Sequence, residues 1–209
     1  MGAPRRLGLL SAAGLALVSA IYAVVVGFGV AEAGLDDPIV DPTLAVMEAI
    51  TLVSAPLVVI LMAALYQASS EERKVFGVLA LAFGAIMAAL TSAVHFVALT
   101  AGRQTGFTTL AWPSTLYAVE LLAWDVFLGL ALLFAAPVFD GPGPRVRARW
   151  ALVVTSVLCL LGALGPIVGE MAVQRIGILG YGVGLPIACV FIAQVFHQGR
   201  PGVRAVQGG

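Results

Sequence analysis

Six apolar segments, each about 20 residues or longer, dominate the sequence. A helix needs roughly 20 apolar residues to cross a hydrocarbon core about 30 Å thick. In lipid, every backbone polar group has to be bonded within the protein, so such runs predict helices. The chain is therefore expected to be an all-α, polytopic membrane protein with six transmembrane helices and short loops. The segments run from 7 to 31, 43 to 67, 75 to 100, 113 to 139, 150 to 171 and 176 to 197.

The overall composition agrees with this class. Of 209 residues, 61% are hydrophobic and 11% are charged, which is outside the range of soluble domains. The net charge is zero, so no basic surface favours nucleic acid as a partner. The two cysteines, Cys159 and Cys189, lie in apolar segments and are expected to pack as small apolar side chains. Because the connections are short, the whole chain, residues 1–209, is expected to form a single bundle domain.

Proline marks two of the predicted helix starts. Asp41 precedes Pro42, and Trp112 precedes Pro113. An N-cap aspartate followed by proline at the first helical position is a common start signal, and the second pair is expected to mark a similar start. Trp112 is also expected to lie at the membrane interface, where tryptophan is enriched.

Basic residues are distributed unevenly between the two ends of the predicted bundle. Arg103 and Arg175 fall at the end opposite the termini. Short cytoplasmic loops hold an excess of lysine and arginine, so both termini are expected to be cytoplasmic and the protein to lie in the cell membrane. The acidic loop with Asp36, Asp37 and Asp41 then faces outward. The nine basic residues at the end of the termini are Arg5, Arg6, Arg73, Lys74, Arg145, Arg147, Arg149, Arg200 and Arg204.

The first segment has some features of a signal peptide. Arg5 and Arg6 precede it, and it ends in Ala31-Glu32-Ala33, which has the form of a signal-peptidase site. The apolar run is about twice as long as a signal-peptide core. Its length favours a retained helix over a cleaved one.

Ionisable residues inside the apolar segments are the main functional signal. Helices rise 1.5 Å per residue, which places Glu48, His95 and Glu120 at a similar depth, roughly 8 to 10 Å below the outer boundary. Asp125 lies deeper, near the middle of the membrane. A charged acid at the centre of a span costs about 2.5 to 3.5 kcal/mol on insertion scales, and such groups usually face the bundle interior. We therefore expect one polar pocket that opens outward or into the outer leaflet.

The fourth segment combines acids with aromatic rings. Glu120 and Asp125 are five residues apart, so on a regular helix they project roughly 140° from each other. We expect one of them to face the pocket and the other to face a neighbouring helix. Tyr117, Glu120, Trp124 and Phe127 form a stripe by their i, i+3 and i+7 spacing.

Glycine patterns predict close packing of the last two segments. "GPIVG" at 165–169 and "GYGVG" at 180–184 each contain GxxxG, a spacing that lets helix backbones approach. The connection "AVQR" between these segments is the shortest, so we expect a tight hairpin. Pro166 and Pro186 are expected to kink it. The same glycine faces could also join copies of the chain in a homo-oligomer.

Several cofactor and metal chemistries find no support. The sequence contains no CxxCH, HExxH, HxxxH or Walker pattern. Its two histidines, on distant sides of the predicted bundle, cannot ligate a b-type haem together. A metal site formed by Glu48, His95 and Glu120 would need three convergent ligands, which sequence alone does not reveal. We therefore expect no cofactor and no metal.

An acid-lined, aromatic pocket within lipid suits a hydrophobic substrate. Protonation of an alkene or epoxide needs a carboxylic acid, aromatic faces that stabilise cations, and exclusion of water. The chain resembles the small integral-membrane terpene cyclases in its length, its helical architecture and its membrane-embedded Glu and Asp. That family has seven spans, whereas this chain has six.

This resemblance implies an enzyme of the isomerase or lyase type that cyclises an isoprenoid, with membrane lipids as its surroundings. The implied acids are Glu48 or Glu120 together with Asp125. Apart from the resemblance, a buried acid needs a hydrogen-bond partner to be an effective proton donor, and His95 is the candidate for this role. The rings implied around the cation are Trp124, Phe96 and Tyr181, and Tyr117 and Trp112 complete the candidate substrate-binding residues.

Two other functions and a structural alternative remain open. Glu48, His95, Glu120 and Asp125 could form a proton relay in a transporter or channel. A complete path would then need hydroxyls such as Thr155 in the cytoplasmic half, which lacks ionisable residues. The chain could also be a non-catalytic membrane subunit whose acids pair with a partner protein. In the structural alternative, the acids form a hydrogen-bond network that fixes helix packing.

Overall fold

The computed structural model describes residues 2–34, 39–105 and 112–198. Within these ranges the regular structure is all helical, and six helices are long and apolar enough to cross a membrane. The predicted fold class and number of spans are confirmed to this extent. Asp36, Asp37, Arg200 and Arg204, which entered the orientation argument, lie outside the described residues. The spans are Ala3–Ala33, Thr43–Ala68, Glu71–Gln104, Thr115–Val138, Pro144–Val168 and Met171–Gln198.

The first three spans are built around α1 (Ala3–Ala33), α2 (Thr43–Ala68) and α3 (Lys74–Leu99), with η1 (Glu71–Arg73) and the short α4 (Ala101–Thr105) flanking α3. The fourth span contains α5 (Thr115–Leu121), η2 (Leu122–Leu128), α6 (Gly129–Ala135) and η3 (Ala136–Val138). The fifth contains α7 (Pro144–Gly162) and α8 (Leu164–Val168), and the sixth contains α9 (Met171–Leu179), η4 (Gly180–Gly184) and α10 (Leu185–Gln198).

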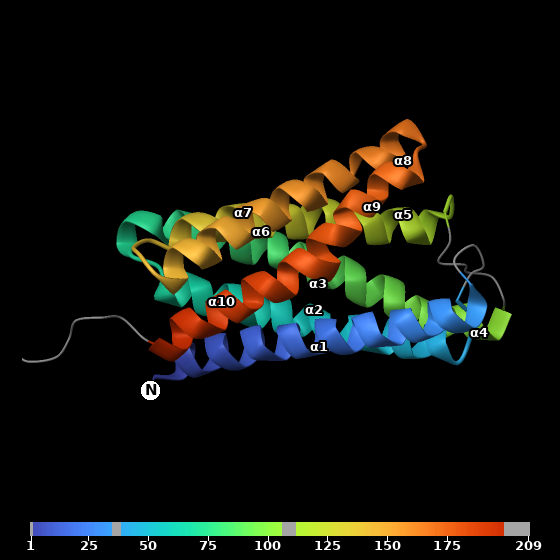
Figure 1. The fold of residues 1–209 in the computed structure, drawn as a ribbon, viewed down its shortest axis with the longest axis horizontal. Helices are drawn as coiled ribbons and strands as arrows, with labels where there is room; N and C mark the ends of the chain where they lie inside the picture. Colours follow the sequence, from blue (N-terminus) through green and yellow to red (C-terminus); the bar gives the residue numbers. More distant parts are fainter. Residues whose placement is uncertain (1, 35–38, 106–111, 199–209) are drawn as a thin grey trace, which may run out of the picture.

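Neighbouring spans in the sequence pack side by side, and the ring closes where α10 lies along α1 (Figure 1). The fourth span is the most enclosed. In its apolar stretch 56% of the residues are buried, and no other span exceeds 33%. This enclosure explains why acids on the fourth span can meet side chains from several neighbours.

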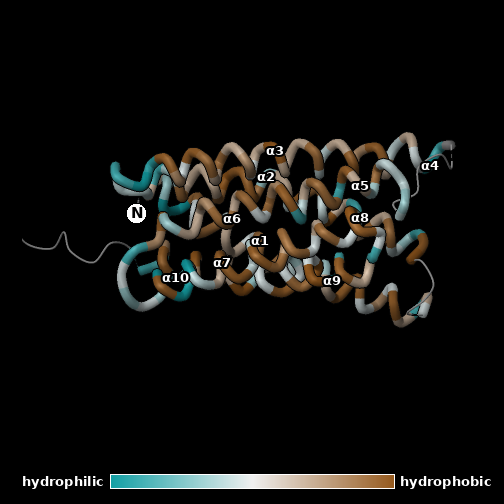
Figure 2. Tube along the Cα trace, turned by 90° about the horizontal axis from the view of Figure 1, so that it is seen from above, coloured by the Kyte–Doolittle hydropathy of each residue, from teal (hydrophilic) through white to brown (hydrophobic). Residues whose placement is uncertain are grey.

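The first residues of α1 and the end of α10 lie at the same end of the bundle (Figure 1). There, Arg5 donates hydrogen bonds to the backbone carbonyls of Phe196 and His197. Arg73 forms an ion pair with Asp140 at 2.8 Å. Hydrophilic residues gather toward the ends of the bundle and apolar residues fill the middle (Figure 2). Six spans thus bring both ends of the described chain to the same end of the bundle. The cytoplasmic location of the two termini stays a prediction.

The predicted helix starts need correction by a few residues. Helix α2 begins at Thr43 with Pro42 at the N-cap position, so Asp41 stands one residue further out, where its carboxylate accepts the N–H of Ala45 at 3.2 Å. Helix α5 begins at Thr115, and its cap is Ser114, whose hydroxyl accepts the N–H of Tyr117 at 3.2 Å. A side-chain oxygen that satisfies a free N–H decides the start in both cases. The connection expected at 101–111 is helical over Ala101–Thr105.

The hairpin of the last two spans turns earlier than predicted. "AVQR" belongs to α9, and the turn lies at 169–170, where Gly169 has a left-handed φ of 78° that suits glycine. The expected close approach is confirmed, and Gly162 is part of it. A Cβ added to Gly162 would stand 2.5 Å from the Cα of Gly177, and one added to Gly165 would stand 2.5 Å from the backbone nitrogen of Gln174.

Candidate functional site

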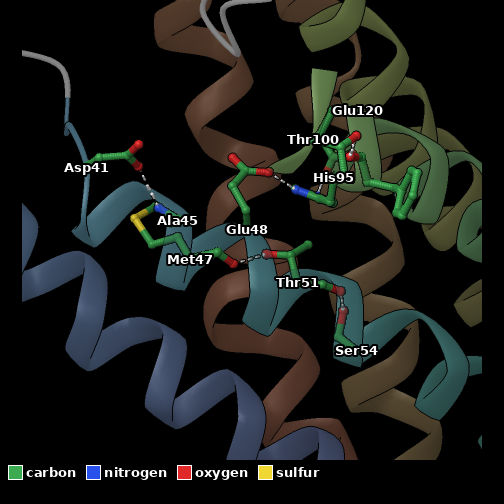
Figure 3. A network of polar contacts seen from close by, with 10 residues as sticks. Asp41, Ala45, Met47, Glu48, Thr51, Ser54, His95, Thr100 and Glu120 are labelled. Atoms are coloured by element: carbon green, nitrogen blue, oxygen red, sulfur yellow. Dashed lines mark hydrogen bonds and ion pairs between the residues drawn. The ribbon is translucent and has the colours of Figure 1, made fainter. Parts of the chain in front are cut away.

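Three buried side chains from three different spans meet near the end of the bundle that carries α4. Glu48 projects from α2, His95 from α3 and Glu120 from α5 (Figure 3). Nδ1 of His95 contacts a carboxylate oxygen of Glu48, and Nε2 lies 2.7 Å from a carboxylate oxygen of Glu120. The side chains of Glu48 and His95 are 7% exposed and that of Glu120 is 14% exposed. We call this chain of contacts the relay.

Helical periodicity explains why these residues face inward. Thr91 and His95 lie one turn apart on α3, and both are buried. On α2, Glu48 and Thr51 share a buried face in the same way. The sequence argument that placed Glu48, His95 and Glu120 at a similar depth agrees with their contact.

The two contacts of His95 require at least two protons in the relay. Each contact between a ring nitrogen and a carboxylate oxygen needs one proton, so two protons are shared among Glu48, His95 and Glu120. Either the imidazole carries both protons between two carboxylates, or a neutral imidazole lies between one carboxylate and one carboxylic acid. The net charge is −1 in both arrangements. A shift of the two protons along the chain therefore moves an acidic hydrogen from one glutamate to the other without changing the total charge.

One carboxylate oxygen of the relay has no partner among the described residues, and two tyrosines lie in the same region of the bundle. The second oxygen of Glu120, Oε2, is buried without a hydrogen-bond partner in the described part of the chain. Tyr117 lies within electrostatic range of both Glu120 and Asp125, and Tyr22 of α1 lies within range of Glu120 and Glu48. The sequence analysis did not identify Tyr22. A hydroxyl in the middle of an otherwise apolar segment was the available signal, because a buried tyrosine usually finds a polar neighbour.

Asp125 forms a second polar centre and is fully buried. Its Oδ2 accepts a long hydrogen bond of 3.4 Å from the amide of Gln174, and the same amide nitrogen donates to the hydroxyl of Tyr181 at 3.1 Å. The other oxygen, Oδ1, has no hydrogen-bond partner among the described residues and lies against Gly177. Sequence reasoning missed Gln174 because it treated "AVQR" as a loop.

An aromatic pair adjoins this carboxylate. The rings of Trp124 and Tyr181 have centroids 5.4 Å apart and planes tilted by 57°. The indole N–H of Trp124 is also buried without a partner in the described ranges. The site therefore combines a carboxylate, two π faces and a hydrogen-bond donor. Because unpartnered buried polar atoms are costly, such groups often belong to functional sites.

The predicted angle of roughly 140° between Glu120 and Asp125 assumed a regular α-helix. The fourth span departs from a regular α-helix at Asp125. Residues Leu122–Leu128 form a π-helical segment, η2, and a second such segment, η4, carries Tyr181. Insertions of this kind are frequent at functional sites. Glu120 and Asp125 do face different neighbours, α3 and α9. The predicted aromatic stripe is divided, because Phe127 stacks on Phe83 of α3 with centroids 6.4 Å apart while Trp124 turns to Tyr181.

Two predicted substrate-binding residues are not brought to these centres. Phe96 is 61% exposed on the outside of the bundle, one residue after the buried His95. Trp112 is 37% exposed in the turn before α5. Glu170 is exposed in the turn between the last two spans. Of the predicted aromatic residues, Trp124 and Tyr181 do lie at the Asp125 centre.

A small cavity connects the relay with the end of the bundle. It measures about 180 Å³ and is bordered by Glu48 and by the ion pair of Asp41 with Arg103. Figure 3 shows Asp41 at the start of α2, next to the helix turn that carries Glu48. The remaining lining residues are Leu44, Ala45, Ala98, Leu99 and Gly102. Glu48 is therefore the member of the relay that borders this cavity at the α4 end of the bundle.

Metal binding has no support in the described residues, where no group of three His, Cys, Asp or Glu side chains is arranged to hold an ion. Both nitrogens of His95 are already bonded to carboxylates. Comparisons of the chain with protein-family models, curated proteins and solved structures gave no match. The functional argument therefore rests on the geometry of the two polar centres.

Proposed function

We propose that the chain is an integral-membrane enzyme that transfers protons to and from a hydrophobic, alkene-bearing substrate such as an isoprenoid. The observation that carries this proposal is the contact of both His95 nitrogens with Glu48 and Glu120. This arrangement supplies a proton from the outward cavity at Glu48 to a carboxyl group inside the bundle. Cyclisation of a terpene precursor is the most concrete form of this chemistry.

The reaction begins with proton transfer from the Glu120 carboxyl group to one carbon of a double bond. The π electrons of the alkene form the new C–H bond, and the adjacent carbon becomes a cation. The rings of Trp124 and Tyr181 stabilise positive charge through their faces. Glu48 then takes up a proton from the cavity that it borders, His95 receives a proton from Glu48, and His95 passes a proton to Glu120.

Asp125 completes the reaction as the base. Its Oδ1 removes a proton from a carbon next to the cation, and the electrons of that C–H bond form a new double bond. One proton enters at Glu48, and the proton that Asp125 takes up is released after the product leaves. The product is therefore an isomer of the substrate, either cyclised or with a shifted double bond. The buried site excludes water, which would otherwise capture the cation.

The distribution of buried polar groups supports delivery of protons to an internal site. Beyond Asp125, toward the end with the termini, the buried polar side chains of the described residues are hydroxyls such as Ser54, Thr155 and Ser156. Ionisable side chains thus connect the outward cavity to the interior on one side only. A proton path that ends inside the bundle serves chemistry at that point.

The test compares lipid extracts from cells that express the wild-type chain, Glu120→Gln or Glu170→Gln. Glu170 is exposed and serves as the matched control. The wild type and Glu170→Gln should form a new isomeric product from added isoprenoids, and Glu120→Gln should form about 100-fold less, as loss of a general acid usually causes. In deuterated water the product should carry one deuterium. Identical extracts with and without the wild-type chain, across alkene-bearing isoprenoids, would reject the enzyme.

A proton-coupled carrier is the second candidate, and the ion pair of Asp41 with Arg103 beside the cavity favours it. Breaking and forming this pair would open and close the path to Glu48. In proteoliposomes, a carrier would dissipate a pH gradient when its solute is present, and Glu120→Gln would abolish this flux. A gradient that persists equally in wild-type and empty liposomes would speak against the carrier.

A further inference from the structure

A separate groove lies between α7 and α10, which pack against each other. It has a volume of about 390 Å³ and is open along the surface of the bundle. The lining residues are Val146, Arg147, Trp150, Ala151, Val154 and Phe191. None of them belongs to the relay or to the Asp125 centre.

The groove is apolar along its length and basic at one end. Arg147, Trp150 and Val154 follow one face of α7 at i, i+3 and i+7. A rise of 1.5 Å per residue places Val154 about 10 Å deeper in the bundle than Arg147. Trp150 and Val154 are 61% and 54% exposed, so they face the surroundings of the bundle. Arg147 lies close to the start of α7 at Pro144, where the span begins.

Arg147 is positioned for an external anion. Its guanidinium carbon lies 5.3 Å from the centroid of the Phe191 ring, so the ring of α10 supports the cation. Within the described residues Arg147 forms no ion pair, whereas Arg73 at the same end is paired with Asp140. The first turn of α7 adds the partial positive charge of a helix N-terminus.

We propose that this groove binds an anionic glycerophospholipid of the surrounding leaflet, with the lipid phosphate at Arg147 and an acyl chain along Trp150 and Val154. Charge complementarity favours an anionic headgroup, and the apolar lining favours an attached hydrocarbon chain over a free anion. Basic pockets between transmembrane helices bind anionic headgroups in this way. The site is independent of the proposed enzymatic function.

The experiment uses the full-length protein purified in detergent and measures bound lipid by native mass spectrometry and thermal unfolding. Phosphatidylglycerol, phosphatidylcholine with the same acyl chains, and inorganic phosphate are added in parallel. The wild type should retain phosphatidylglycerol and gain in Tm more than with phosphatidylcholine. Inorganic phosphate should produce no such shift. Arg147→Gln should bind phosphatidylglycerol about five-fold more weakly, the loss expected for one basic contact.

The control is Arg149→Gln, which removes the same charge from another face of α7. This variant should retain the lipid preference of the wild type, and Trp150→Ala should weaken the retention of both lipids. Equal effects of Arg147→Gln and Arg149→Gln would overturn the proposal, because binding would then depend on overall charge. An equal response of the wild type to both lipids, or a full response to inorganic phosphate, would overturn it as well.

Discussion

His95 lies between two carboxyl groups and reduces the electrostatic repulsion between them. Its ring separates Glu48 from Glu120 and bonds to both of them. Without the imidazole, the two acids would lose their common partner in a site from which water is largely excluded. The residue is therefore expected to support both proton transfer and the packing of α2, α3 and α5.

Replacing His95 with leucine should destabilise the protein by about 3 kcal/mol or more, since removal of one member of a buried ionic group leaves the other uncompensated. The measurement is thermal or denaturant unfolding in detergent. His197→Leu is the control, because the His197 side chain is exposed. Equal stabilities of the two variants would contradict a structural role of the relay.

At the scale of elements, the two π-helical segments bring the second polar centre together. Segment η2 carries Trp124 and Asp125, and segment η4 carries Tyr181, so both sides of the ring contact depart from regular α-helix. Glycines permit the close approach that presses Asp125 against α9. Gly165, Gly180 and Gly184 face residues of the fifth and sixth spans within the same chain. A homo-oligomer through the GxxxG faces remains a prediction, and these three positions are already used internally.

Gly177→Ala tests this packing. An added Cβ would collide with Oδ1 of Asp125 and stand 3.3 Å from the Cα of Gly162, so we expect a loss of about 1 to 3 kcal/mol from overpacking. The matched control is Gly182→Ala on the same span, because the nearest atom to a Cβ there, on Ile178, is 3.8 Å away. Apparent Tm in detergent distinguishes the variants. A Gly182→Ala protein as destabilised as Gly177→Ala would show that the contact with Asp125 is not the cause.

For the whole molecule, a ring of six spans brings the beginning and end of the described chain to one end and the cavity at Glu48 to the other. Basic residues concentrate at the end of the termini, which predicts that this end is cytoplasmic. The outward cavity and Arg103 then face the other side of the membrane. This orientation decides from which side the relay exchanges protons.

Cysteine labelling can determine the orientation, because the two native cysteines are fully buried. Gln104→Cys should react with a membrane-impermeant maleimide in intact cells, since Gln104 is exposed in α4. Glu72→Cys, exposed in η1 near the opposite end, should react only after permeabilisation. The reverse pattern would invert the topology, and the proton source of the relay would then be cytoplasmic.

The amino-acid sequence by itself determined the helical class, the six spans and the inward faces of Glu48 and His95. Segment length and helical periodicity are local properties, so they can be read along the chain. The sequence also indicated a tight last hairpin, but it misplaced the turn. The turn lies at 169–170, and "AVQR" belongs to α9, which begins at Met171 after it.

Only the tertiary structure decided which side chains meet. The contact of His95 with Glu48 spans 47 residues, and the bond of Gln174 to Asp125 spans 49. Such pairings depend on how the helices rotate and pack against each other, and a π-helical segment changes that rotation locally. The exposure of Phe96 beside the buried His95 is instead local in origin, since adjacent helical residues project about 100° apart. The sequence thus supplied the acids, and the packing of the spans separated them into a relay and a second centre at Asp125.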